Sequence, residues 1–270
     1  MLAVLKDQLA KRPGSPFFSR AAGGAEPRRR YLIATTGRTG STFLCSRISD
    51  YACLGFPMEF LNEGYIGQFE AVFPNPSLQD FEAFVGANFC SEQGVFGLKS
   101  DWWRFRRAEE LEALQSLVQP LDLIVYLYRQ DFVAQAVSLA LAVETQVWHS
   151  RDVADRSLED LHGEVAFDAA AIKEHARNIL NQEYYWQQYI KQSEVRCLSL
   201  SYEAVAGDVD AAVRSIARAL DQKLGPAPPP SSVIERRRSA ISLGWIDRFY
   251  DECDDFVDFW TEHRGLISAA

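Results

Sequence analysis

The stretch YLIATTGRTGSTFL, residues 31–44, constrains the fold of this chain more than any other. Residues 31–35 have the character of a buried strand, and residues 41–45 are suited to opening a helix. A short loop containing Gly37 and Gly40 joins the two segments. The backbone N–H groups of such a loop and the positive end of the helix dipole together bind anions. We therefore expect a strand–loop–helix unit that holds a phosphate or a sulfonate.

The side chains of the loop favour this interpretation but leave a second one open. Arg38 adds a full positive charge, and Ser41 and Thr42 add hydroxyl groups. The loop differs from the ATPase pattern G-x-x-x-x-G-K-[ST], because Gly37 and Gly40 are only three residues apart and no Lys follows Gly40. The alternative is an ordinary strand-to-helix turn in which the glycines only relieve crowding.

Composition excludes several functional classes. With 270 residues, 47% hydrophobic and 24% charged, the chain can form one large α/β domain or two small ones. A net charge of −9 disfavours nucleic-acid binding as the main role. We expect no stable membrane insertion and a cytoplasmic location, because no apolar run approaches the roughly 18 residues of a span and no secretory signal is evident. Five cysteines without C-x-x-C spacing and four scattered histidines predict neither a disulfide framework nor a metal site.

Strand patterns alternate with helix patterns along the rest of the chain. Besides 31–35, strands are predicted at 94–100, 121–128 and 195–203. Helices are predicted at 41–50, 78–90, 106–118, 132–140, 158–192, 209–220 and 243–262, with a further short one within 64–73. This alternation predicts an α/β fold with a parallel, doubly wound sheet, whose ligand lies at the carboxyl edge of the strands.

Basic residues occur where the predicted strands end. Lys99 closes the strand 94–100 and Arg129 follows the strand 121–128, so both should lie at the same sheet edge as Arg38. Ser138 lies in the helix that follows Arg129, and the two residues together suggest a second anion site. The alternatives are a surface lysine and an arginine that makes a structural salt bridge.

Glu59 lies between Met58 and Phe60, an apolar setting that is unusual for a carboxylate. Partial desolvation would raise its pKa and suit it to work as a general base. The alternative is a glutamate at a helix N-terminus, where the helix dipole favours a negative charge.

Taken together, these motifs resemble those of sulfotransferases, most closely the Stf0 family of bacterial carbohydrate sulfotransferases. The 128–148 segment is the most specific, because its R-x-D-x-x-x-Q-A-V-S pattern exceeds what a strand and a helix require. The segments that carry the resemblance are TGRTGST (36–42), GFPMEF (55–60), GLKSDW (97–102), YRQDFVAQAVSLALAVETQVW (128–148) and, more weakly, ERRRSAISLGWIDRFY (235–250).

The resemblance implies a P-loop-like three-layer fold, with a central parallel sheet flanked by helices, and 3′-phosphoadenosine-5′-phosphosulfate (PAPS) as the sulfonate donor. Residues 1–30 would be an N-terminal extension and residues 31–270 a single domain, with a C-terminal lid or helical segment at about 231–265. The reaction would need no metal and would leave 3′,5′-ADP as product. The acceptor would be a carbohydrate or glycolipid hydroxyl, and the resemblance implies a homodimer.

The resemblance also assigns roles to individual residues. Arg38 would steady the bridging oxygen as the sulfonate leaves, and Glu59 would be the catalytic base. Arg129 and Ser138 would hold the 3′-phosphate. The loop residues expected at the 5′-phosphosulfate are Gly37, Arg38, Thr39, Gly40, Ser41 and Thr42, and the additional charges are Lys99, Arg236 and Arg237.

Two other functions remain open at this point. One is a nucleotide phosphotransferase with a P-loop-type fold, which would require ATP and Mg²⁺. The other is a nucleotide- or partner-binding protein without catalysis. Segments 62–93 and 101–118, which should select the acceptor, match the family poorly, so the acceptor stays undetermined.

Overall fold

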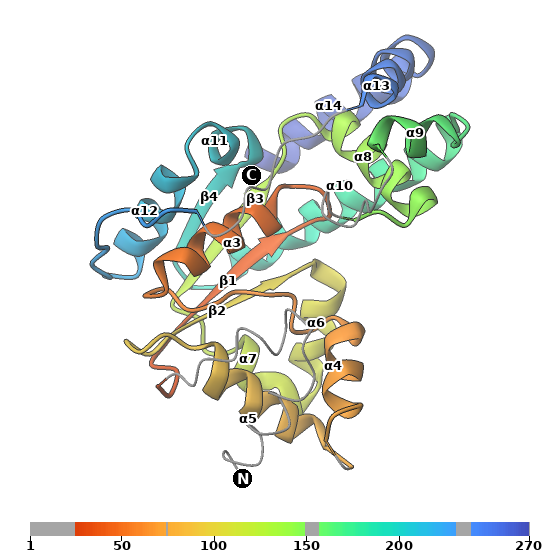
Figure 1. Ribbon diagram of the computed structural model, residues 1–270. Coiled ribbons are helices and arrows are strands. Elements are labelled where there is room, and N and C mark those ends of the chain that lie inside the picture. The colour runs from red at the N-terminus through yellow and green to blue at the C-terminus, as the bar shows by residue number, and fades with distance from the viewer. Residues whose placement is uncertain (1–24, 74, 149–156, 231–238, 270) are drawn as a thin grey trace.

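One parallel sheet positions the rest of the molecule. The computed structural model describes residues 25–73, 75–148, 157–230 and 239–269 (Figure 1). In this part of the chain, four parallel strands form a sheet in the order β2-β1-β3-β4. The strands are β1 (Arg29–Thr35), β2 (Val95–Ser100), β3 (Leu123–Tyr128) and β4 (Cys197–Ser201). The α/β fold with a parallel sheet, predicted from the sequence, is confirmed.

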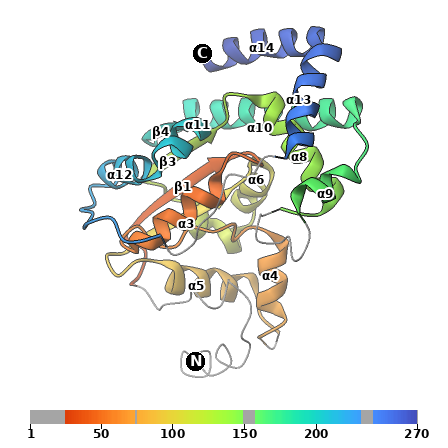
Figure 2. The ribbon, with the colours of Figure 1, turned by 45° about the horizontal axis from the view of Figure 1, so that its top comes forward.

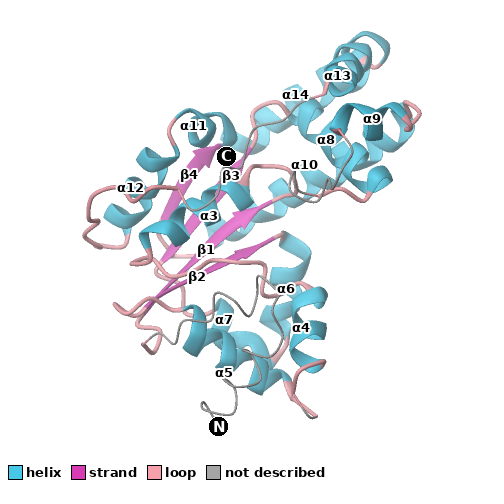
Figure 3. Cartoon of the chain, viewed as in Figure 1, coloured by secondary structure: helices cyan, strands magenta, loops and turns pink. Residues whose placement is uncertain are grey.

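Alternate residues of the strand β1 pack into two different cores, because successive side chains of a strand point to opposite faces of the sheet. Leu32 and Ala34 are fully buried with residues of α5 (Leu78–Phe89), α6 (Trp102–Glu110) and α10 (Ala169–Gln192). Tyr31 and Ile33 are fully buried with residues of α3 (Ser41–Tyr51) and α12 (Val209–Ala219). Helices therefore cover both faces of the sheet and produce the three expected layers (Figure 3).

A third core joins helices beyond the carboxyl edge of the sheet. It contains buried apolar residues of α8 (Phe132–Thr145), α10, α13 (Ala240–Glu252) and α14 (Asp254–Ala269). Figure 2 shows α13 beside α8 and α14 above α10. The remaining elements are short: α4 (Glu63–Glu70), the 3-10 helix η1 (Glu112–Leu114), α7 (Gln115–Val118), α9 (Leu158–Gly163) and α11 (Tyr202–Gly207).

Three helices expected from the sequence are divided in the structure. The expected helix 106–118 is replaced by α6, η1 and α7, because Leu111 takes an extended conformation. The expected helix 158–192 is two helices, and Asp168 caps the second by accepting hydrogen bonds from the N–H groups of Ala170 and Ala171. The expected helix 243–262 is interrupted at Cys253, whose ψ of 30° leaves the helical region.

The described residues bear on part of the expectations for membrane insertion and for a C-terminal lid. Within them, no helix combines the length and the apolar character that crossing a membrane requires. The proposed lid at 231–265 includes residues 231–238, which lie outside the described part, whereas α13 and α14 pack on α8 and α10. The division into residues 1–30 and 31–270 stays a prediction.

Candidate active site

The loop between β1 and α3 has the backbone of an anion site. Arg38 and Gly40 have φ angles of 67° and 73°, in the left-handed region that turns the chain sharply. Gly40 is the N-cap residue of α3, and no side chain caps the helix there. The first N–H groups of α3 therefore remain directed toward whatever anion the loop holds.

Buried side chains support this loop from below. Gln135 Nε2 on α8 donates to Thr36 Oγ1 at 2.7 Å and to the Gly37 carbonyl at 2.6 Å. Trp186 Nε1 on α10 donates to the Thr35 carbonyl at 3.1 Å. Neither residue was predicted at the site from sequence, where Trp186 is only part of an aromatic helix face that packs on the core. Gln135 could have been identified, because it stands in the most specific motif, whereas Trp186 gave no signal beyond helical spacing.

Arg38 lies in contact with Ser138, the residue expected at the second anion site. Its Nε donates to Ser138 Oγ at 2.9 Å, and its Nη1 donates to the Trp148 carbonyl at 2.6 Å. Burial lowers the pKa of Arg38, and the nearby phenol of Tyr202 opposes this shift. The structure thus joins Ser138 to the loop between β1 and α3.

Lys99 connects the proposed base to the loop. The Met58–Leu98 bridge holds residue 59 beside the end of β2, where the N–H of Lys99 donates to the Met58 carbonyl at 3.0 Å. Lys99 Nζ lies 2.9 Å from Glu59 Oε1 and 3.2 Å from Thr42 Oγ1. Burial lowers the pKa of Lys99, but the negative charge of Glu59 opposes burial and the net shift is upward.

The setting of Glu59 differs from the one expected from its neighbours in sequence. Its side chain is 42% exposed and forms an ion pair with the buried Lys99. Its apolar neighbours turn into the core, where Phe60 is fully buried. Glu59 is therefore a partly exposed carboxylate beside an ammonium group. The apolar environment expected for it from the sequence is wrong.

Arg129 and Tyr202 form the other side of the site. Arg129 follows β3 and is buried, with its guanidinium carbon 4.9 Å from the centre of the Tyr202 ring. The ring also lies against Gly40, since a Cβ there would be 2.7 Å from Tyr202 Cδ2. Tyr202 thus lies between the loop after β1 and Arg129. It was expected at the end of the strand 195–203, but β4 ends at Ser201 and Tyr202 begins α11, so no role at the site was predicted for it.

This contact predicts a strong effect of Gly40→Ala. The φ of 73° costs a residue with a side chain about 1–2 kcal/mol, and the new methyl group collides with Tyr202. We expect a lower free energy of unfolding, measured by urea unfolding, and loss of anion binding, measured by ligand titration. Gly67→Ala on α4 is the matched control, because a Cβ there meets nothing within 4 Å; it should be neutral or stabilising by about 0.5–1 kcal/mol. Equal behaviour of the two variants would contradict the tight Gly40–Tyr202 contact.

His162 on α9 is a titratable group near this site that the sequence analysis left without a role. Its Nδ1 lies 2.6 Å from Ser239 Oγ. Burial lowers its pKa below the ordinary value of 6.5, the charge of Glu159 opposes the shift, and the charge of Arg38 adds to it. The neutral imidazole is therefore the form that the folded protein favours.

The sign of this shift predicts a pH dependence of stability. Because the unfolded chain binds the proton more tightly, the contribution of His162 is present above about pH 6.5 and is lost as the pH falls through its folded-state pKa. Urea unfolding of His162→Gln between pH 7.5 and 5.5 should show a shallower loss of stability than the wild-type protein. Parallel curves for the two proteins would contradict this prediction.

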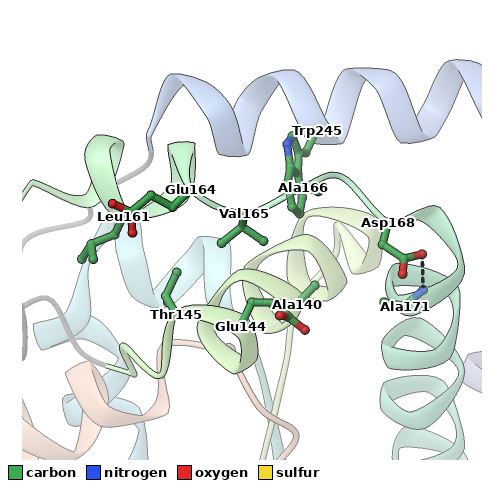
Figure 4. Close-up of a pocket in the computed structure, with 10 residues that line it drawn as sticks. All are labelled: Ala140, Glu144, Thr145, Leu161, Glu164, Val165, Ala166, Asp168, Ala171 and Trp245. Carbon is green, nitrogen blue, oxygen red and sulfur yellow. Dashed lines mark hydrogen bonds between the residues drawn. The ribbon is translucent and has the colours of Figure 1, made fainter.

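A cavity lies apart from this cluster, and two of the predicted site residues are not described by the structure. Arg236 and Arg237 fall outside the described residues. A cavity of about 590 Å³ lies among α8, α9, α10 and α13, where Figure 4 shows Glu144, Glu164 and Asp168 with Trp245. Two of its α8 residues, Ala140 and Glu144, lie on the helix face opposite Ser138. Its carboxylates make it unsuitable for an anionic donor.

The sheet order explains how the cluster forms. The chain leaves β1 for β2 on one side and later returns to β3 on the other side of β1. Loops that leave neighbouring strands β1 and β3 in opposite directions create the crevice where such sheets bind ligands. Arg38 and Arg129 follow these two strands, and Lys99 lies in β2 beside the end of β1.

Comparisons with known proteins agree with this arrangement. Two solved structures share the fold. A sulfotransferase domain from the curacin biosynthetic pathway has a TM-score of 0.51 and 11% identity, and the match covers 81% of this chain and 83% of that chain. A sulfotransferase from Alicyclobacillus acidocaldarius has a TM-score of 0.50 and 14% identity, and the match covers 90% of this chain and 96% of that chain. The trehalose 2-sulfotransferase of Mycobacterium tuberculosis is 27% identical over 83% of this chain and 95% of its own length. The enzyme of the same name from Mycolicibacterium smegmatis is 25% identical over 81% of this chain and 93% of its own length. The model of the Stf0 sulphotransferase family matches residues 30–252, and this chain is therefore a member of that sulfotransferase family.

Proposed function

We propose that this enzyme transfers the sulfonate of PAPS to a hydroxyl group of a carbohydrate or glycolipid acceptor. Membership of the Stf0 sulphotransferase family supports the reaction class. The names of two relatives, both trehalose 2-sulfotransferases, support a carbohydrate as acceptor. A homodimer stays a prediction.

The contacts of Lys99 with Glu59 and Thr42 are the observation on which the proposal rests. One ammonium group lies within 3.2 Å of both Glu59 and Thr42 of the loop. A carboxylate beside an anion loop is suited to accept the proton of an acceptor hydroxyl as that hydroxyl attacks the sulfonate. Lys99 and Arg38 are suited to stabilise the negative charge that develops on the leaving oxygen.

The donor groups of the site fit a ligand that carries phosphate at two ends. Arg38 and the first N–H groups of α3 form one cationic position after β1. Arg129 forms another after β3, and the ring of Tyr202 lies between the two. We assign the first position to the 5′-phosphosulfate and the second to the 3′-phosphate. Ser138 stays a proposed partner of Arg129 at the 3′-phosphate, and its hydroxyl also accepts a hydrogen bond from Arg38.

Ligand-dependent stability tests the proposal directly. A ligand at 100 times its Kd should stabilise the folded protein by about 2.7 kcal/mol. We expect a thermal shift with 3′,5′-ADP and a much smaller one with 5′-AMP at the same concentration. A shift with ATP and Mg²⁺ in place of 3′,5′-ADP would replace the proposal by a phosphotransferase. Response to 3′,5′-ADP with no sulfonate transfer to any sugar tested would instead support a binding protein.

The acceptor side of the site is the next element to test. Glu63 on α4 accepts hydrogen bonds from Arg104 and Arg107 on α6, at 3.4 and 3.3 Å. These residues lie in the segments that matched the family poorly. Burial lowers the pKa of Arg104, but the charge of Asp101, with smaller contributions from Glu63 and Glu59, makes the net shift upward. Incubation with PAPS and a panel of trehalose, glucose and glycolipid acceptors, followed by mass spectrometry of the products, would identify the acceptor.

A further inference from the structure

The turn that carries Arg129 is held by a residue from the far end of the chain. This β3–α8 turn, residues 129–131, presents two backbone carbonyl groups to Arg264 on α14. Arg264 Nη1 donates to the Gln130 carbonyl at 2.7 Å, and Arg264 Nη2 donates to the Arg129 carbonyl. The guanidinium thus contacts the backbone of the residue proposed to bind the 3′-phosphate.

A buried carboxylate fixes the orientation of this guanidinium. Glu183 on α10 accepts from Arg264 Nε at 2.9 Å and from Arg264 Nη2 at 2.8 Å. The two side chains are only 15% and 3% exposed. Burial raises the pKa of Glu183, and the charge of Arg264 opposes the shift. A bidentate pair of this kind fixes direction as well as distance, because the planar guanidinium matches the carboxylate.

Two further contacts restrain the same turn. Glu203 on α11 accepts from the N–H of Gln130 at 3.2 Å. Asp131 caps α8 by accepting from the N–H of Ala134 at 2.8 Å, and it also accepts from Tyr250 Oη on α13 at 3.3 Å. The turn is therefore connected to α10, α11, α13 and α14.

The Arg264–Glu183 pair acts on the turn through hydrogen bonds and not through a net positive charge. Glu183 neutralises Arg264 within hydrogen-bond distance, so the pair adds little net charge to the anion site. The unusual feature is instead the fork of donors on the two carbonyl groups next to Arg129. Lysine, with a compact ammonium group, cannot reproduce this planar fork.

We propose that Arg264, oriented by Glu183, is a positioning residue that sets the backbone of Arg129 and thereby the selectivity for a 3′-phosphate. This inference rests on the proposed function, because it takes Arg129 as the 3′-phosphate ligand. It assigns the C-terminal helix α14 a role in the donor site, although α14 follows the matched family region of residues 30–252.

The test uses a double variant, because Arg264→Met alone leaves the Glu183 carboxylate buried without its charge partner and strongly destabilises the fold. Replacing both members, Arg264→Met with Glu183→Leu, removes the buried charges and should keep the fold. The quantity to measure is the ratio of the Kd of 5′-AMP to the Kd of 3′,5′-ADP, by calorimetric titration. We expect this ratio to fall at least tenfold in the double variant and less in Arg264→Lys.

A control variant removes a different buried arginine. Arg47 on α3 is 7% exposed and pairs with Asp210 on α12 at 2.6 Å. Arg47→Met should lose stability and keep the wild-type Kd ratio. Amide exchange measured by mass spectrometry supplies a readout without ligand: the peptide covering 128–136 should exchange faster in the double variant, and the peptide covering 41–51 should not.

The outcomes distinguish this inference from the proposed function. A folded double variant with wild-type amide exchange at 128–136 and a wild-type Kd ratio would overturn the positioning role and leave the proposed function intact. A wild-type protein that does not prefer 3′,5′-ADP over 5′-AMP would overturn the proposed function, and with it the selectivity that Arg264 is proposed to set.

Discussion

Glu59→Gln should lower kcat by about 10²–10⁴-fold while leaving the Kd for 3′,5′-ADP nearly unchanged. The amide has the shape of the carboxylate but cannot accept the proton of the acceptor hydroxyl. The substitution also removes the negative charge that raises the pKa of the buried Lys99, so the pKa of that ammonium group should fall. Single-turnover sulfonate transfer and calorimetric titration of 3′,5′-ADP measure the two effects separately.

An exposed carboxylate outside the site provides the control for this experiment. The Glu252 side chain on α13 is 47% exposed, close to the 42% of Glu59, and it pairs with Arg248 in the same helix. Glu252→Gln should therefore keep kcat within about twofold, because it removes only an exposed ion pair. Wild-type turnover in Glu59→Gln would exclude Glu59 as the base, whereas equal losses in both variants would point to a general effect of charge.

Arg129→Ala is the second change with a large expected effect. Charge-assisted hydrogen bonds contribute about 1.5–3 kcal/mol each, so loss of one should reduce the preference for 3′,5′-ADP over 5′-AMP by about 10- to 150-fold. The affinity for 5′-AMP, which lacks the 3′-phosphate, should change little. Calorimetric titration of both nucleotides measures the ratio directly.

An exposed arginine serves as the matched control. Arg248 on α13 is 53% exposed and pairs with Glu252 at 2.6 Å within the same helix. Arg248→Ala should leave the nucleotide ratio unchanged. Retention of the wild-type ratio in Arg129→Ala would remove Arg129 from the 3′-phosphate site, and loss of affinity for both nucleotides alike would indicate collapse of the Tyr202 side of the site.

The two experiments address different parts of the site. Glu59 contacts Lys99, at the end of β2, whereas Arg129 follows β3 and lies over Tyr202. The strand β1 separates β2 from β3 in the sheet. Effects of the two substitutions should therefore be nearly additive in free energy, as is usual for sites without shared partners.

Much of the candidate site could be predicted from the sequence because its residues occur at strand ends. A strand signal places Lys99 and Arg129, and the sheet rule places both beside the loop at 36–42. The motif 128–138 likewise identified Ser138. Its contact with Arg38 could not be predicted, since it depends on how α8 passes the loop.

Errors in the sequence analysis arose where sequence neighbours differ from neighbours in space. Apolar residues flank Glu59 in sequence, but Phe60 turns into the core while the carboxylate meets Lys99. The helix expected at 106–118 is broken by the extended Leu111, which no proline or glycine marks. Helical periodicity alone does not reveal such a break.

The sequence by itself determined the α/β class, the loop at 36–42, the family and most of the charged residues proposed to bind the donor. These features are encoded locally, by hydrophobic period, by glycine at the turn and by residue spacing within a motif. Only the tertiary structure decided that Lys99 links Glu59 to Thr42, that Tyr202 lies between Gly40 and Arg129, and that Arg264 holds the turn of Arg129. Each of these contacts joins segments from different helices and strands, and it exists because the packing of those elements brings distant side chains within hydrogen-bond or van der Waals distance.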